Sequence, residues 1–120
     1  MTRHWFYTAC AALLGLGLGC GGMDAPNQRL STAEAAVRAA SEVGAGEVPR
    51  ASLHLKLAQE QIDEAKQLMA DSRNEQADLA LRRAQADAEL SIQVAKEQKT
   101  LAQAQESKDK FEKLKAQAKR

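Results

Sequence analysis

The side chain with the most definite chemistry is the thiol of Cys20. It ends the run LGLGC, residues 16–20, which closes an uncharged apolar segment over residues 5–18 behind a short cationic start. As a helix, that 14-residue segment would span roughly 21 Å, less than the ~30 Å of a bilayer's hydrocarbon core. A thiol in this position is suited to lipid attachment. We therefore expect residues 1–19 to be a signal peptide that is removed, and Cys20 to carry acyl chains at the mature N-terminus.

The end of this segment resembles the lipobox of bacterial lipoproteins, in which Leu, a small residue and then Gly or Ala precede the Cys. Gly19 and Cys20 match that motif, whereas Gly17 and Leu18 depart from it because the usual Leu is shifted by one position. The resemblance implies a cell-envelope protein anchored by fatty acids such as palmitate. Gly21, where Asp would favour retention, resembles lipoproteins sent to the outer membrane, facing the periplasm.

Two other interpretations of residues 1–19 remain open, an ordinary secretory signal and an uncleaved signal anchor. No Ala-x-Ala cleavage site precedes the charged region, which argues against the first. Cys10 lies inside the apolar segment, so Cys20 is the only thiol expected in the mature chain. We therefore expect no disulfide within it.

The other reactive side chains lack the neighbours that catalysis or metal binding requires. His54 is the only histidine after the signal and has no second His or Cys at ligand spacing, so we expect a solvent-facing helix residue. Asp63 and Glu64 are typical of a charged helix face, and Ser31 and Ser72 are better explained as helix caps than as nucleophiles. The sequence thus predicts a protein that is not an enzyme, with no cofactor and no metal, and export argues against nucleic acid as a partner.

Composition predicts an all-α protein. Ala is the commonest apolar residue of the mature chain, Phe111 is its only aromatic residue, and neither Gly nor Pro occurs after Pro49. The charge is divided unevenly: residues 20–95 hold 8 basic and 12 acidic side chains, whereas residues 96–120 hold 8 basic and 4 acidic. A net charge of −4 is therefore followed by one of +4.

The pattern along the chain predicts a tether and three helices. Residues 20–30 are expected to form a lipidated flexible tether, and the capping-box spacing from Ser31 to Glu34 predicts a first helix over residues 31–44. Pro49 begins a second helix over residues 49–70, whose heptad seam comprises Ala51, Leu55, Ala58, Ile62, Ala65 and Met69. A third helix starts near Asn74 and continues to about residue 118.

The third helix carries two apolar stripes, which predicts two partner helices. One stripe comprises Ala77, Leu81, Ala84, Ala88 and Ala95, and the other Leu79, Ala86 and Leu90. We expect helix two to cover the first stripe and helix one the second, which gives an antiparallel hairpin or three-helix bundle over residues 31–98. Residues 99–120 would form a basic helical extension of the long C-terminal helix, and the Ala-lined seams predict marginal stability.

Residues 31–98 resemble an Ala-rich helical family of unknown function found in bacterial envelope lipoproteins. The resemblance rests on the connection Gly-Ala-Gly-Glu-Val-Pro, residues 44–49, the heptad helix and the Ala-x-x-Ala spacing of Ala77, Ala80, Ala84 and Ala88. In longer members this domain often precedes a peptidoglycan-binding domain like that of outer membrane protein A. The family implies no catalytic residues.

A weaker resemblance is to the major murein lipoprotein, which has lipid at one end, a heptad helix and a basic end. That family finishes on a Lys that is joined to peptidoglycan, whereas here Arg120 follows Lys119, which argues against covalent attachment. The residues expected to contact the envelope are Lys108, Lys110, Lys113, Lys115, Lys119 and Arg120.

Together these features predict a helical scaffold or adaptor between the outer membrane, bound through Cys20, and peptidoglycan or an acidic envelope protein. A self-assembling coiled-coil lipoprotein is the alternative. A small-ligand-binding protein is disfavoured because the Ala seams leave no evident pocket. We expect a monomer or a weak oligomer, because the distal stripe has few large side chains.

Overall fold

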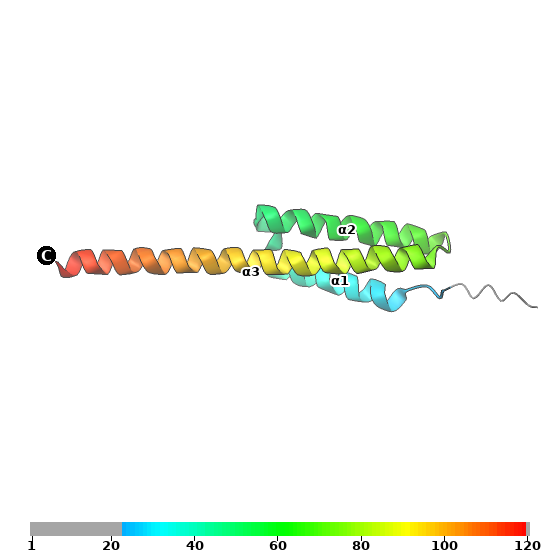
Figure 1. Ribbon diagram of the computed structural model, residues 1–120, viewed down its shortest axis with the longest axis horizontal. Coiled ribbons are helices and arrows are strands. Elements are labelled where there is room, and N and C mark those ends of the chain that lie inside the picture. Colours follow the sequence, from blue (N-terminus) through cyan, green and yellow to red (C-terminus); the bar gives the residue numbers. More distant parts are fainter. Residues whose placement is uncertain (1–22, 120) are drawn as a thin grey trace, which may run out of the picture.

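The computed structural model describes residues 23–119 and has an all-α fold, as the sequence predicts. Helix α1 comprises Asn27–Glu42, the 3-10 turn η1 Ala45–Glu47, helix α2 Pro49–Ala70 and helix α3 Asn74–Ala118. Helices α1 and α2 lie along the first half of α3, and the second half of α3 continues alone (Figure 1). The described residues include no strand.

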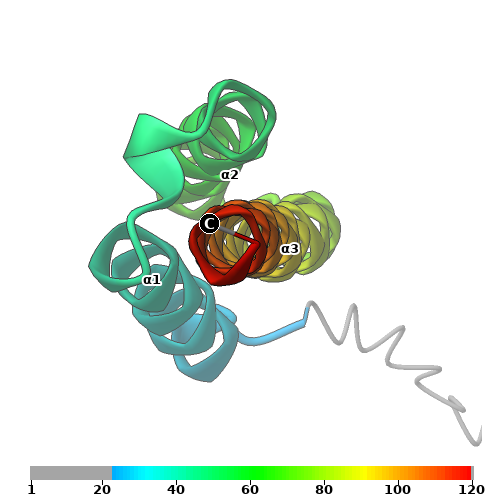
Figure 2. The same ribbon diagram turned by 90° about the vertical axis from the view of Figure 1, so that its left-hand side faces the viewer.

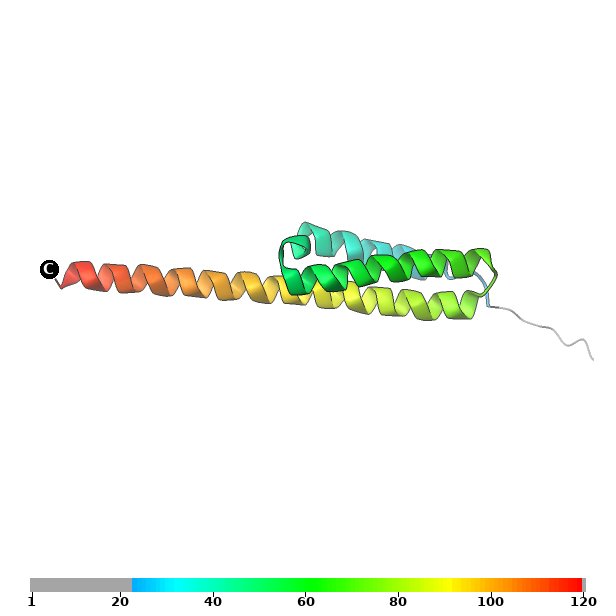
Figure 3. The ribbon, with the colours of Figure 1, turned by 90° about the horizontal axis from the view of Figure 1, so that it is seen from above.

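Two tight connections reverse the chain. Between α1 and α2, Gly44 adopts the left-handed conformation with φ 83°, which a residue without a Cβ reaches at no steric cost, and Pro49 starts α2. Between α2 and α3, Ser72 has φ 58°, and the amide of Arg73 donates to the carbonyl of Leu68 at 2.8 Å. These short turns keep α2 antiparallel to both of its neighbours, as the view from above shows (Figure 3).

The predicted bounds of α2 and the predicted start and end of α3 are confirmed, but the first helix was placed wrongly. Helix α1 starts at Asn27 rather than at Ser31 and ends at Glu42, so residues 27–30 belong to it and not to the tether. The reason is tertiary: Leu30 packs against the core, and Arg29 pairs with Asp78 of α3. Neither Ser31 nor Ser72 caps a helix, because Ser31 lies inside α1 and no side-chain cap is formed at α3.

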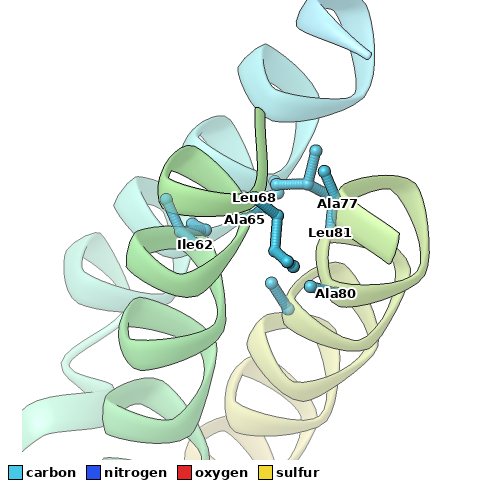
Figure 4. Close-up of a cluster of buried hydrophobic side chains, with 8 residues drawn as sticks. Ile62, Ala65, Leu68, Ala77, Ala80 and Leu81 are labelled. Atoms are coloured by element: carbon cyan, nitrogen blue, oxygen red, sulfur yellow. The ribbon is translucent and has the colours of Figure 1, made fainter. Parts of the chain in front are cut away.

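The core is a seam of small side chains between α3 and its two partners. One cluster joins Ala33 of α1 to Ile62 and Leu68 of α2 and to Leu81 and Ala84 of α3. Figure 4 shows part of it, with Ile62 and Leu68 on α2 and Leu81 on α3. A second cluster near the η1 end comprises Ala40, Ala45, Ala51, Leu55, Val94 and Ala95. The predicted seam of α2 is buried apart from its last position, where Leu68 is buried and Met69 only partly so.

The first predicted stripe of α3 is buried, but the second one is not. Leu79 is 54% exposed and Leu90 45% exposed, and Ala86 is also exposed, so the assignment of this stripe to helix one was wrong. Viewed along the axis, α1 and α2 lie side by side against the same half of α3 (Figure 2). The small residues of this one buried stripe let both helices approach α3. Polar contacts flank the stripe on either side: Asp78 bonds to Arg29 of α1, and Asp87 bonds to His54 of α2.

Beyond Ala95, no other helix of the described chain packs along α3, and only its first turns border a groove beside Val48 and Pro49. Every described residue from 96 to 119 is exposed, including Leu101, Phe111 and Leu114, which are 57–64% exposed. At ~1.5 Å per residue the 45-residue helix is about 67 Å long, and about half of it extends beyond the bundle. We call this segment, residues 96–119, the distal half. The bundle therefore comprises residues 23–95, and the distal half projects from it.

Candidate functional site

Met23, the first described residue, and the predicted contact lysines lie at opposite ends of α3. Cys20 and Arg120 fall outside the described residues, but the nearby Met23 is held at the start of α3, where the Asn74 side-chain amide donates to its carbonyl at 2.7 Å. Lys119 follows the other end of α3. Most of the length of α3 thus separates Met23 from the predicted contact lysines (Figure 1).

The predicted contact lysines are exposed, but the helix does not gather them on one face. At 100° per residue, Lys108 and Lys115 lie on one side of α3, and Lys110 and Lys113 lie on the opposite side. Lys110 also pairs with Glu106, with 2.6 Å between Nζ and Oε1. A ring of mobile cations around a helix gives attraction to anionic surfaces without a defined binding geometry.

Local pairs rather than packing stabilise the distal half. An i,i+4 ion pair joins Glu106 to Lys110, and the Gln105 side-chain amide donates to Asp109 at 2.8 Å across another turn. Such exposed pairs contribute about 0.2–0.5 kcal/mol each. These local pairs favour the helical conformation of the distal half in water, and its other side chains remain exposed to solvent.

A buried carboxylate, which the sequence analysis did not single out, ties α1 to α3. Asp78 is 8% exposed and accepts hydrogen bonds from Arg29 of α1 and, at 2.8 Å, from Arg82 one turn along α3. Arg82, and then Arg29, outweigh the cost of burial and lower the pKa of Asp78 below its usual value of 3.8. Two guanidinium groups on one carboxylate satisfy it fully, so this cluster is structural.

We expect Asp78→Asn to lower the free energy of unfolding by about 1–3 kcal/mol at pH 7, because Arg29 and Arg82 lose their charged partner at the buried position of Asp78. Since the folded-state pKa is depressed, the stabilisation is present above about pH 4 and is lost as the pH falls below that value. Urea unfolding at pH 7 and pH 3 measures this. The gap between wild type and variant should narrow at pH 3; an equal gap at both values would contradict the ion-pair explanation. The exposed Asp109→Asn is the matched control.

His54 is not the solvent-facing residue that the sequence predicted. Its Nδ1 lies 2.9 Å from Oδ1 of Asp87 on α3, and Gln61 donates to the other carboxylate oxygen at the same distance. The side chain of His54 is 26% exposed. Ser91, which is fully buried, donates to the carbonyl of Ala51 at 2.7 Å. These bonds fix the register of α2 on α3.

The concave surfaces are open grooves between helices. The groove between α1 and α2 is lined by Val37, Ile62 and four charged residues, and a Glu34–Lys66 pair with 2.9 Å between Oε1 and Nζ links the two helices there. The hydrogen bond to Glu34 raises the pKa of Lys66. Within residues 23–119, no three His, Cys, Asp or Glu side chains are grouped to hold a metal ion. No helix in that range is both long and apolar enough to cross a membrane.

Comparison with known proteins finds one family. The model of the family described as "Domain of unknown function (DUF4398)" matches residues 28–111, which include most of α1, all of α2 and α3 up to Phe111. No curated protein and no solved structure matches the chain. The match crosses the boundary between bundle and distal half, so the extended third helix belongs to the domain.

Proposed function

The chain belongs to the DUF4398 family, and we propose that it is a non-enzymatic envelope lipoprotein that spaces a membrane from a second, anionic component of the envelope. Lipid on Cys20 holds one end at the outer membrane, facing the periplasm. The basic distal half meets peptidoglycan or an acidic protein at the other end. The place of family members ahead of peptidoglycan-binding domains, implied by the resemblance above, agrees with such a role.

The observation that carries this proposal is the separation of the two ends by a single rigid helix. Met23 is bonded to Asn74 at the start of α3, only three residues after Cys20, while the exposed lysines lie between residues 108 and 119. The distance spanned is of the order of the helix length, about 67 Å. Helices α1 and α2 stiffen the first half of α3, and the distal half stays exposed for binding.

Lipidation of Cys20 is the first expected outcome of this proposal. Intact mass spectrometry of the protein extracted from bacterial membranes should show loss of residues 1–19 and the mass of added acyl chains. Cys20→Ser should leave an unprocessed precursor, because the thiol is the acylated group, whereas Cys10→Ser should be processed normally. A mature N-terminus at another residue would contradict the anchor.

Self-assembly is the second candidate, favoured by the exposure of Leu101, Phe111 and Leu114 on an uncovered helix. In that case the distal halves of several copies would cover one another. Sedimentation equilibrium separates the two functions: a stable trimer at micromolar concentration, lost when residues 99–120 are removed, would replace the spacer by a structural assembly. A monomer or a weak association agrees with the spacer.

A further inference from the structure

An exposed apolar stripe continues along both halves of α3. Leu79, Ala86 and Leu90 on the bundle half are exposed, and so are Leu101, Ala104, Phe111 and Ala118 on the distal half. At 100° per residue all seven lie within one third of the helix circumference, which faces mostly away from α1 and α2. At one edge of it, Leu79 and Leu101 border open grooves beside α2. The stripe is therefore one surface about 60 Å long, rather than two unrelated patches.

We propose that this stripe pairs, antiparallel, with the same stripe of a second copy of the chain. The opposite net charges of the bundle and the distal half favour a second copy as the partner and an antiparallel orientation of the two helices. The bundle, residues 23–95, holds 12 acidic and 8 basic side chains, a net −4, and the distal half holds 4 acidic and 7 basic, a net +3. An antiparallel pair sets each distal half beside the other copy's bundle and joins opposite charges, whereas a parallel pair sets like beside like.

Individual positions within the stripe agree with this direction. Arg83, Glu97, Lys108 and Lys115 interrupt it, and in a parallel pair each would face its own copy. Antiparallel pairing centred near Leu101 brings the two Leu101 side chains together and sets Leu90 opposite Phe111. It also sets Glu97 opposite Ala104 and Ala86 opposite Lys115, and the like charges Arg83 and Lys119 meet only at the two ends of the contact. The polar interruptions make the pair weak and reversible.

The pairing does not depend on the lipid anchor, but for anchored copies it would determine how α3 lies relative to the membrane. In the antiparallel pair the two Met23 ends lie about 67 Å apart or more. Two copies anchored in one membrane can pair in this way only when α3 lies along the surface, whereas an upright α3 leaves its distal half free. Pairing and contact with an envelope polymer then compete for the same helix.

Site-directed crosslinking tests the pair and its direction. The chain from residue 20 with Cys20→Ser retains every residue of both core clusters, so single cysteines can be placed in it. With a short bifunctional maleimide, Leu101→Cys should crosslink to itself. Ala86→Cys should not do so alone, because the two sites are far apart, but it should crosslink to Lys115→Cys when the variants are mixed.

The control is Lys99→Cys, at the same level of the helix but about 160° from Leu101. Because paired thiols have a much higher effective concentration than free ones, the dimer yield of Leu101→Cys should exceed that of Lys99→Cys at least about tenfold. It should also fall in high salt, which screens the opposite charges. Self-crosslinking of Ala86→Cys would indicate a parallel pair, and equal yields from Leu101→Cys and Lys99→Cys would indicate random collision. Either result overturns the proposal.

Discussion

Ile62→Asp should unfold most of the bundle at room temperature. Ile62 is 5% exposed and packs in the cluster that joins all three helices, with Ala33 on α1 and Leu81 on α3. A carboxylate there would be buried without a partner, which costs more than about 3 kcal/mol. The core around it consists mainly of Ala, so we expect a total free energy of unfolding near the low end of the usual range of about 5–15 kcal/mol. Helix content by circular dichroism and a urea titration measure the loss.

The matched control is Glu60→Gln, two residues away on the same helix. Its side chain is 59% exposed, and its pair with Lys56 has 3.8 Å between Nζ and Oε1, a contact that contributes little. The free energy of unfolding should therefore change by less than about 0.5 kcal/mol. If the two substitutions have equal effects, the buried face of α2 has been assigned to the wrong residues.

The sequence was most informative where one local signal decided the structure. Pro49 fixes the start of α2, and the heptad spacing that follows places the apolar residues on one face of the helix. The bounds of α2 and most of its buried positions were therefore predicted. The polar segment before Asn74 was likewise the one plausible helix break after α2. No Gly or Pro follows it that could end α3 before residue 118. Helix propensity and spacing suffice for such elements.

The errors arose where partner helices decide the outcome. The start of α1 depends on Arg29 reaching Asp78, which lies 49 residues further along the chain, and no local pattern reports that contact. The two stripes of α3 look equivalent in sequence, but α1 and α2 share one of them because its Ala residues allow two close approaches. The second stripe is left exposed, and only the three-dimensional arrangement reveals that neither α1 nor α2 covers it.

Binding of the distal half to cell-wall material should be lost when its lysines are neutralised. In the variant with Lys108, Lys110, Lys113 and Lys115 all changed to Gln, the net charge of residues 96–119 falls from +3 to −1. Attraction to an anionic polymer should then become weak repulsion. Because these side chains are exposed, their interactions are screened over ~8 Å at physiological ionic strength, so binding by the wild type should also weaken steeply as salt rises.

A control with the same change in charge separates position from total charge. Arg38, Arg50, Lys56 and Arg83 are exposed basic residues of the bundle, and changing all four to Gln removes four positive charges without touching the distal half. If the distal half is the contact, this variant should retain most of the binding. Similar losses in both variants would mean that total charge alone governs the interaction.

The most direct test of the spacer is cosedimentation of the chain from residue 20, carrying Cys20→Ser, with isolated peptidoglycan sacculi at low and high salt. We expect the wild type and the bundle control to pellet with the sacculi at low salt and to be released at high salt, and the distal variant to stay in the supernatant at both. If the wild type never pellets, or pellets like the distal variant under both conditions, the distal half is not a cell-wall contact and the proposed spacer between membrane and peptidoglycan is wrong.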